Sequence, residues 1–310
     1  MKKKYLLCAI VTLAAISLFG CGAFSKEKSG KESDTTIVAE KETTDDTEED
    51  STVEEPGTTE ESTSDTLQEP ETVTFDGDVN SISNTPVTWG VGVQTYEDNR
   101  PVAPVQLQEQ YGTKYAVDFI KENEKVIYLT FDEGYENGYT SQILDTLKEK
   151  NVKAVFFITM PYAKTETELV KRMIDEGHVV GSHSVTHPSD GMPSLTVEQQ
   201  INEYQELHNY IRDNYGYTMY LFRPPAGKFS EQSLAVAQKC GYRSVMWSFA
   251  YNDWDPDNQM EVSKALDNAV GKLHNGAIYL LHAVSKTNTE MLGDFIDSAR
   301  EMGYEFKEYK

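Results

Sequence analysis

The feature that most restricts the fold of this chain is an alternation of short apolar runs with helical patterns, which begins at Val126. Short, nearly continuous apolar runs are typical of parallel strands that are buried on both faces. Between the runs, apolar side chains recur at the 3.6-residue spacing of helices. Strands that alternate with helices predict a parallel sheet covered by helices. The runs are residues 126–131, 154–159, 179–182, 220–222, 244–247 and 277–281.

Side chains with catalytic chemistry follow most of these runs. In a (β/α) barrel the carboxyl ends of all strands open on one face, so residues far apart in sequence converge there. A doubly wound open sheet also places its site at the strand ends, so this pattern alone is consistent with both architectures. The residues in question are Asp132, Glu133, His183, Arg223, Asp253, Trp254 and His282.

His183 and His187, in the segment HSVTH, have the spacing of a two-histidine metal pair. Such a spacing alone is more often incidental, but a neighbouring carboxylate strengthens it. Two imidazoles and one carboxylate leave a metal with an open position for water, as in hydrolytic zinc sites. Of Asp132 and Glu133, one can bind the metal while the other takes a proton from water. Alternatively, Asp132 and Glu133 belong to a solvent-exposed acidic turn that has no catalytic role.

Arg223 and His282 also have two interpretations each. Arg223 precedes Pro224-Pro225 and either fixes a carboxylate in place or forms a surface ion pair. His282 follows the apolar segment 278–281 and is either a core histidine or a general acid. The predicted face of the site favours the functional interpretation of both.

Five segments resemble, in order, the five motifs of the NodB-like polysaccharide deacetylases, carbohydrate esterase family 4. The resemblance covers residues 125–310 and implies a distorted (β/α) barrel. It also implies a hydrolase that uses a divalent metal, commonly Zn²⁺, to remove acetyl groups from N-acetylated sugars. The segments are TFDEG (130–134), HSVTH (183–187), RPPAG (223–227), WSFAYNDW (247–254) and YLLH (279–282).

The resemblance also implies a role for each matching residue. The set comprises a base with its positioning residue, an acid, metal ligands and substrate contacts. By this resemblance Asp132 is the general base, Arg223 its positioning residue, His282 the acid, His183, His187 and Glu133 the metal ligands, and Ala226, Trp254 and Asp253 the substrate-binding residues. The backbone N–H of Ala226 would face the oxyanion, and Trp254 would form an apolar wall for the sugar.

Two positions depart from the family pattern. Glu133 stands in place of the second aspartate of the first motif, and Ala250 in place of the aspartate that tunes the acid histidine, so the pKa of His282 has to be set differently. Together with residues 134–140 (GYENGYT) and Trp89-Gly90, these departures resemble the muramic-lactam branch. That branch deacetylates N-acetylmuramic acid in peptidoglycan strands stripped of peptide, ahead of muramic δ-lactam formation during sporulation.

Two other functions remain open. One is an N-acetylglucosamine deacetylase of peptidoglycan or another glycan. The other is a catalytically impaired glycan-binding lipoprotein, which the changes at Glu133 and Ala250 motivate. The presence of both an acid and a base favours an enzyme, since a binding module needs neither.

The N-terminus has the layout of a signal peptide over residues 1–20, with three lysines before an apolar core. The segment Leu18-Phe19-Gly20-Cys21 resembles a lipobox, which implies acylation of Cys21 and anchoring at the extracytoplasmic face of the cell membrane. An ordinary cleaved signal or a single-span anchor is the alternative.

Charge divides the rest of the chain. The net charge is -23, which argues against a nucleic-acid partner. Residues 31–80 carry 18 acidic side chains against two lysines, and they contain almost no large apolar residues. We therefore expect residues 21–80 to form a disordered tether. Residues 81–310 should form the catalytic domain, with 81–125 as a flanking segment. No oligomerisation signal is evident, so we expect a monomer.

Overall fold

The structure is a computed structural model that describes residues 74–310. Within that range eight strands form one sheet, in the order β10-β3-β4-β5-β6-β8-β2, with β9 also paired to β3. Every pairing in this sheet is parallel. The sheet curls so strongly that Phe249, beyond β8, forms an isolated parallel bridge with Tyr279 of β9. The expected barrel-like α/β fold is confirmed.

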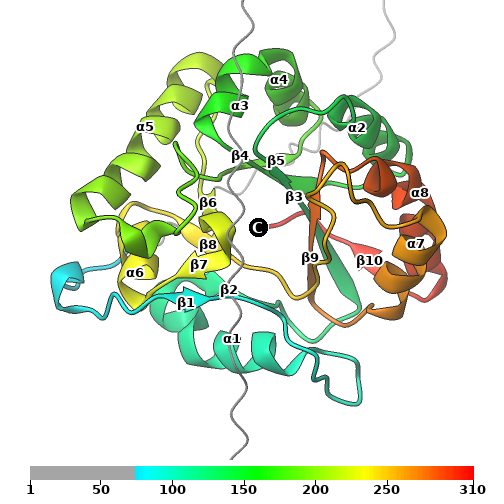
Figure 1. Ribbon diagram of the computed structural model, residues 1–310, viewed down its shortest axis with the longest axis horizontal. Helices are drawn as coiled ribbons and strands as arrows, with labels where there is room; N and C mark the ends of the chain where they lie inside the picture. Colours follow the sequence, from blue (N-terminus) through cyan, green and yellow to red (C-terminus); the bar gives the residue numbers. More distant parts are fainter. Residues whose placement is uncertain (1–73) are drawn as a thin grey trace, which may run out of the picture. The chain divides into compact units, whose positions relative to one another are not determined.

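All six apolar runs of the sequence contribute strands to this sheet. Figure 1 shows the strands around the centre of the molecule and the helices outside them. A second, two-stranded sheet pairs β1 with β7. The strands are β1 (Val87–Thr88), β2 (Val117–Asp118), β3 (Val126–Glu133), β4 (Ala154–Ile158), β5 (Val179–Ser182), β6 (Leu221–Phe222), β7 (Lys228–Phe229), β8 (Arg243–Val245), β9 (Ala277–His282) and β10 (Glu305–Phe306).

The helices cover the outer face of the sheet. Apolar residues at helical spacing within 169–174, 197–211, 234–240 and 291–299 predict four helices, and these correspond to α4, α5, α6 and α8. The other four helices were not predicted. Among residues 74–310 the helices are α1 (Val102–Tyr115), α2 (Thr140–Glu149), α3 (Met160–Thr165), α4 (Thr167–Asp175), α5 (Val197–Tyr215), α6 (Glu231–Lys239), α7 (Val262–Gly271) and α8 (Lys286–Glu301), with short 3-10 turns at Val79–Ser81, Met192–Ser194 and Pro225–Gly227.

The two faces of the sheet bury different sets of side chains. Successive residues of a strand point to opposite faces, so each strand contributes alternate residues to each set. In β3, Val126 and Tyr128 belong to a small inner cluster that also holds Tyr309 from the C-terminus. Ile127 and Leu129 belong to the larger outer cluster beneath the helices. The same alternation continues to the strand ends and decides which polar residues face the site.

The flanking segment is part of the same domain. It supplies α1 and β2, and β2 pairs with β8. Trp89 donates its backbone N–H to the carbonyl of Gly227 at 2.8 Å and its indole N–H to the carbonyl of Trp247 at 3.2 Å. These bonds attach the segment to the loops that follow β6 and β8.

The folded region begins before residue 81. Val79 is 3% exposed, and the ring centroids of Phe75 and Tyr115 lie 6.3 Å apart. The tether was expected to extend to residue 80, but Phe75 and Val79 pack on the domain. The folded domain therefore begins earlier in the chain than residue 81. The predicted signal peptide, the predicted lipidation site Cys21 and the predicted tether up to residue 73 lie outside the described residues. None of the helices within residues 74–310 has the length and apolar character that a membrane crossing requires.

Candidate active site

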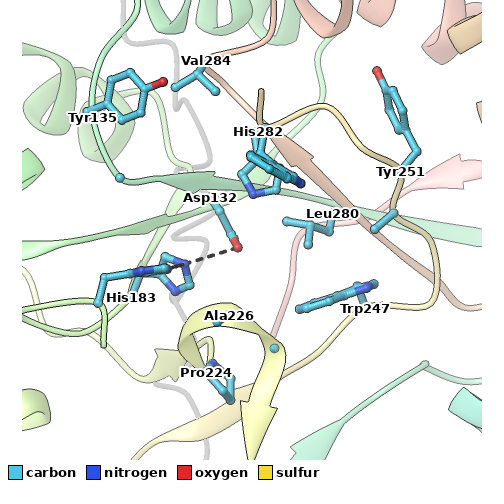
Figure 2. A pocket seen from close by; sticks show the side chains of 15 residues that line it. Asp132, Tyr135, His183, Pro224, Ala226, Trp247, Tyr251, Leu280, His282 and Val284 are labelled. Atoms are coloured by element: carbon cyan, nitrogen blue, oxygen red, sulfur yellow. Dashed lines mark hydrogen bonds and ion pairs between the residues drawn. The ribbon is translucent and has the colours of Figure 1, made fainter. Parts of the chain in front are cut away.

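A cavity of about 600 Å³ opens at the carboxyl ends of the strands. It brings together most of the site residues expected from the sequence, but Glu133, Arg223 and Asp253 do not line it. Its lining residues are Asp132, Gly134, Tyr135, His183, His187, Pro224, Ala226, Gly227, Trp247, Ala250, Tyr251, Trp254, Leu280, His282 and Val284. In Figure 2, Asp132 lies between His183 and His282.

Asp132 ends the inner face of β3 and is held by Arg223. The guanidinium Nη1 donates to Asp132 Oδ1 and to Thr130 Oγ1, both at 2.8 Å. Arg223 is fully buried and is fixed further by the carbonyls of Val245 and Met246. Burial alone would raise the pKa of Asp132, but the positive charge of Arg223 outweighs it, so this pKa lies below its ordinary value. Asp132 is therefore ionised at neutral pH and can accept a proton.

His183 and His187 face each other beyond the carboxyl end of β5. Their Nε2 atoms are 3.1 Å apart. The Nδ1–H of His183 donates to the carbonyl of Arg223 at 2.9 Å, which leaves its Nε2 lone pair directed into the cavity. Burial lowers the pKa of His183 to about 4, so its imidazole is neutral at neutral pH. His183 Nε2 also lies 3.5 Å from Asp132 Oδ2.

This arrangement fits part of a metal site. Two nitrogen ligands of a tetrahedral zinc ion, each about 2.0–2.1 Å from the metal, are about 3.3 Å apart. The 3.1 Å separation of the two histidine nitrogens is close to that value. However, no group of three or more His, Cys, Asp or Glu side chains within residues 74–310 is arranged to hold a metal. The histidine pair would supply two ligands, beside the Asp132 carboxylate.

Glu133, the expected third ligand, is not brought to the histidines. It follows Asp132 on β3 and therefore points to the opposite face, as Leu129 and Phe131 do. Its carboxylate is fully buried, and within residues 74–310 neither oxygen has a hydrogen-bond partner. Burial, with the negative charges of Glu136 and Asp132, raises the pKa of Glu133 well above its ordinary value. This placement disagrees with the predicted ligand role of Glu133.

His282 ends β9 on the other side of the cavity, and its partner is Asp253. His282 Nδ1–H donates to Asp253 Oδ1, and its backbone N–H donates to Oδ2, both at 2.8 Å. Burial alone would lower the pKa of His282, but the hydrogen bond and charge of Asp253 outweigh it, so this pKa lies above its ordinary value. The protonated imidazole is therefore favoured, as a general acid requires.

The role expected for Asp253 needs correction. Asp253 was expected to contact substrate, but it is 0% exposed and holds His282 from behind. Asn288 in the first turn of α8 completes this arrangement, because its Nδ2 donates to Asp253 Oδ2 at 2.5 Å and to the carbonyl of His282 at 3.1 Å. Although position 250 is an alanine, Asp253 and Asn288 thus supply polar partners for His282. No signal in the sequence pointed to Asn288.

The rim of the cavity carries exposed aromatic rings. Tyr135 is 53% exposed and Trp254 is 59% exposed, and both line the cavity. Aromatic faces of this kind can stack against the apolar faces of sugar rings. Ala226 also lines the cavity, in a left-handed backbone conformation with φ 55°. Ala226 and Asp132 line the same cavity (Figure 2), which is compatible with the predicted oxyanion contact.

Comparison with known proteins identifies relatives of the same architecture. The sequence profile of a family described as polysaccharide deacetylase matches residues 120–245. The chain is 40% identical to the peptidoglycan-N-acetylmuramic acid deacetylase PdaA of Bacillus subtilis over 231 residues, which are 73% of this chain and 86% of PdaA. The solved structure of PdaA, described as a family 4 carbohydrate esterase, superimposes with a TM-score of 0.68 at 39% identity, covering 73% of this chain and 96% of that one.

A relative that is named for a different substrate is also similar. The peptidoglycan-N-acetylglucosamine deacetylase PgdA of Listeria monocytogenes is 35% identical over 182 residues. Those residues are 59% of this chain and 37% of PgdA. The similarity to PdaA thus extends over more of both chains.

Proposed function

The chain belongs to the polysaccharide deacetylase family, carbohydrate esterase family 4, and from this premise we propose that it removes the acetyl group from N-acetylmuramic acid in peptidoglycan. As a member of this family the chain is a hydrolase that acts on amide bonds. The greater extent of its similarity to PdaA supports muramic acid over glucosamine as the target. We further propose that this step precedes muramic δ-lactam formation in strands stripped of peptide.

The observation that carries an enzymatic function is the pairing of a base and an acid across one cavity. Arg223 lowers the pKa of Asp132 and so favours its ionised form, and Asp253 raises the pKa of His282 and so favours its protonated form. General acid and base catalysis requires these two opposite protonation states at the same pH. A glycan-binding module would need neither buried pair.

The reaction follows from these positions. Asp132 accepts a proton from water as the water oxygen attacks the acetyl carbonyl. The backbone N–H of Ala226 stabilises the negative charge that develops on the carbonyl oxygen. His282 then donates its proton to the nitrogen as the C–N bond breaks, which releases acetate and leaves the free amine of the sugar.

The family is generally metal-dependent, and we propose that His183 and His187 bind a divalent metal ion. We propose Zn²⁺ as this ion because imidazole nitrogens are common zinc ligands. A bound metal of this kind lowers the pKa of a bound water and polarises a carbonyl. The neutral imidazole of His183, oriented by the carbonyl of Arg223, is ready to act as a ligand.

We also propose that the enzyme is a monomer anchored to the extracytoplasmic face of the cell membrane through acylated Cys21. The signal layout of residues 1–20 and a wall substrate support this location. Cys21→Ala should abolish incorporation of labelled palmitate, and continued labelling of that variant would contradict the anchor.

The substrate is tested by mass spectrometry of glycan strands, with and without peptide, after incubation with the purified chain and Zn²⁺. We expect loss of acetyl from muramic acid in the strands without peptide and no change with Asp132→Asn. Loss of acetyl from glucosamine alone would contradict the proposal and favour the PgdA-like function. Binding of strands without any loss of acetyl would favour a catalytically impaired lipoprotein.

A further inference from the structure

The loop that carries the two histidines adopts a strained backbone. Ser184 has φ 69° and His187 has φ 49°, although neither is glycine. A left-handed conformation is unfavourable for an L-residue, so it persists only where surrounding contacts stabilise it. Ser184 supplies one such contact, because its Oγ accepts the backbone N–H of His187 at 3.0 Å.

The other contacts come from Glu203, on helix α5. Its Oε2 accepts the backbone N–H groups of Val185 and Thr186 at 2.8 and 2.9 Å. Its Oε1 accepts the hydroxyl of Thr186 at 2.7 Å. Glu203 is 8% exposed and Thr186 is exposed, so these bonds are partly buried. Hydrogen bonds to a carboxylate are stronger than those between neutral groups.

Helix α5 is a firm support for this carboxylate. It begins with a capping box formed by Thr196 and Gln199, and it buries Tyr204, Leu207 and Ile211 in the core. Glu203 therefore joins a well-packed helix to Val185 and Thr186, two of the three residues between His183 and His187. Within residues 74–310 its side-chain hydrogen bonds go to Val185 and Thr186 and to neither imidazole.

We infer that Glu203 is a positioning residue that sets the metal affinity of the histidine pair by holding the loop between them. This inference rests on the proposed metal-dependent function. With the loop held, the two Nε2 atoms stay 3.1 Å apart, close to the separation a metal requires. Without the carboxylate, the loop can relax its left-handed residues and move His187 relative to His183.

The test compares Zn²⁺ binding by Glu203 variants, measured by titration calorimetry without substrate. Glu203→Met keeps the length of the side chain and removes both acceptor oxygens, and with them all three hydrogen bonds, so we expect roughly 10–100-fold weaker binding. Glu203→Gln can place its amide carbonyl where Oε2 lies and keep both backbone bonds, so its affinity should fall between those of Glu203→Met and the unmodified chain. Glu206→Met, an exposed change on the same helix, should bind Zn²⁺ as the unmodified chain does.

Thermal unfolding of each metal-free variant separates positioning from stability. A lower unfolding temperature of Glu203→Met with unchanged Zn²⁺ affinity would overturn the inference, as would failure of the unmodified chain to bind Zn²⁺. If Glu203→Met does not fold, Thr186→Val removes the hydroxyl bond alone and should weaken binding by a few-fold. Unchanged binding by that variant would then overturn the inference. Because no sugar is used, a wrong substrate proposal leaves these outcomes unaffected.

Discussion

On each side of the cavity a buried charged residue shifts the pKa of a residue that lines the cavity, and the two charges have opposite signs. On one side a buried cation, Arg223, lowers the pKa of Asp132. On the other a buried anion, Asp253, raises the pKa of His282. In both cases burial alone would favour the neutral group, and a single charged partner outweighs it. The comparison teaches that each reacting group depends on one fully buried residue that does not line the cavity.

The largest expected effect is on the base side. Asp132→Asn keeps the shape of the side chain but cannot accept a proton, so we expect turnover to fall about 10³-fold or more. Release of acetate measures the change. Asp190→Asn, an exposed change in the loop beyond His187, serves as the matched control and should retain full activity. Turnover by Asp132→Asn within a few-fold of the control would remove Asp132 from the base role.

A smaller effect is expected on the acid side. Asp253→Asn removes the charge that keeps His282 protonated, so turnover at neutral pH should fall by about 10²-fold. The pKa of His282 would then drop, because burial and Arg223 both lower it. Loss of activity on the basic side of the pH profile should therefore begin at lower pH. The acidic side, which reflects Asp132, should not move.

The profile of kcat against pH measures this shift. Asp257→Asn, an exposed change in the same loop, should leave the profile unchanged. If the basic limb of the profile is not shifted in Asp253→Asn, Asp253 does not set the pKa of His282. The two sides of the cavity would then not be comparable.

The smallest effect is expected at Trp254, next to Asp253 in the chain. Trp254→Ala removes an exposed ring at the rim, so KM should rise by roughly 5–30-fold, equivalent to about 1–2 kcal/mol of binding. The pH profile should stay as it is, because Trp254 has no part in the His282 pair. Trp254→Phe should recover most of the affinity. A shifted profile in Trp254→Ala would mean that damage to this loop, rather than lost charge, explains Asp253→Asn.

The strands were predictable because parallel strands buried on both faces are marked by local apolar runs. Several missed elements have weaker local signals, whereas α2 buries Ile143, Leu144 and Leu147 at helical spacing and could have been predicted. Strands β2 and β10 are two residues long, and α3 is a six-residue helix. Their positions depend on neighbours far along the chain, which no short window of sequence contains.

The site residues divide in a similar way. The alternation of strand residues separates Asp132 from Glu133, since Asp132 shares its face with Val126 and Tyr128. This signal was present in the sequence, but both the metal-site pattern and the family resemblance assigned the two carboxylates to one site. The partner of His282 had no such signal, because Asp253 lies 29 residues away with a whole helix between them.

By itself the sequence determined the alternation of strands and helices, the chemistry at the strand ends and the face to which each strand residue points. All three depend on neighbours within a few residues. Only the tertiary structure decided which buried groups pair. Arg223 meets Asp132 across 91 residues of chain, and Glu203 meets the histidine loop from a separate helix. These pairings depend on the curl of the sheet and the packing of its helices, which arise from the whole chain at once.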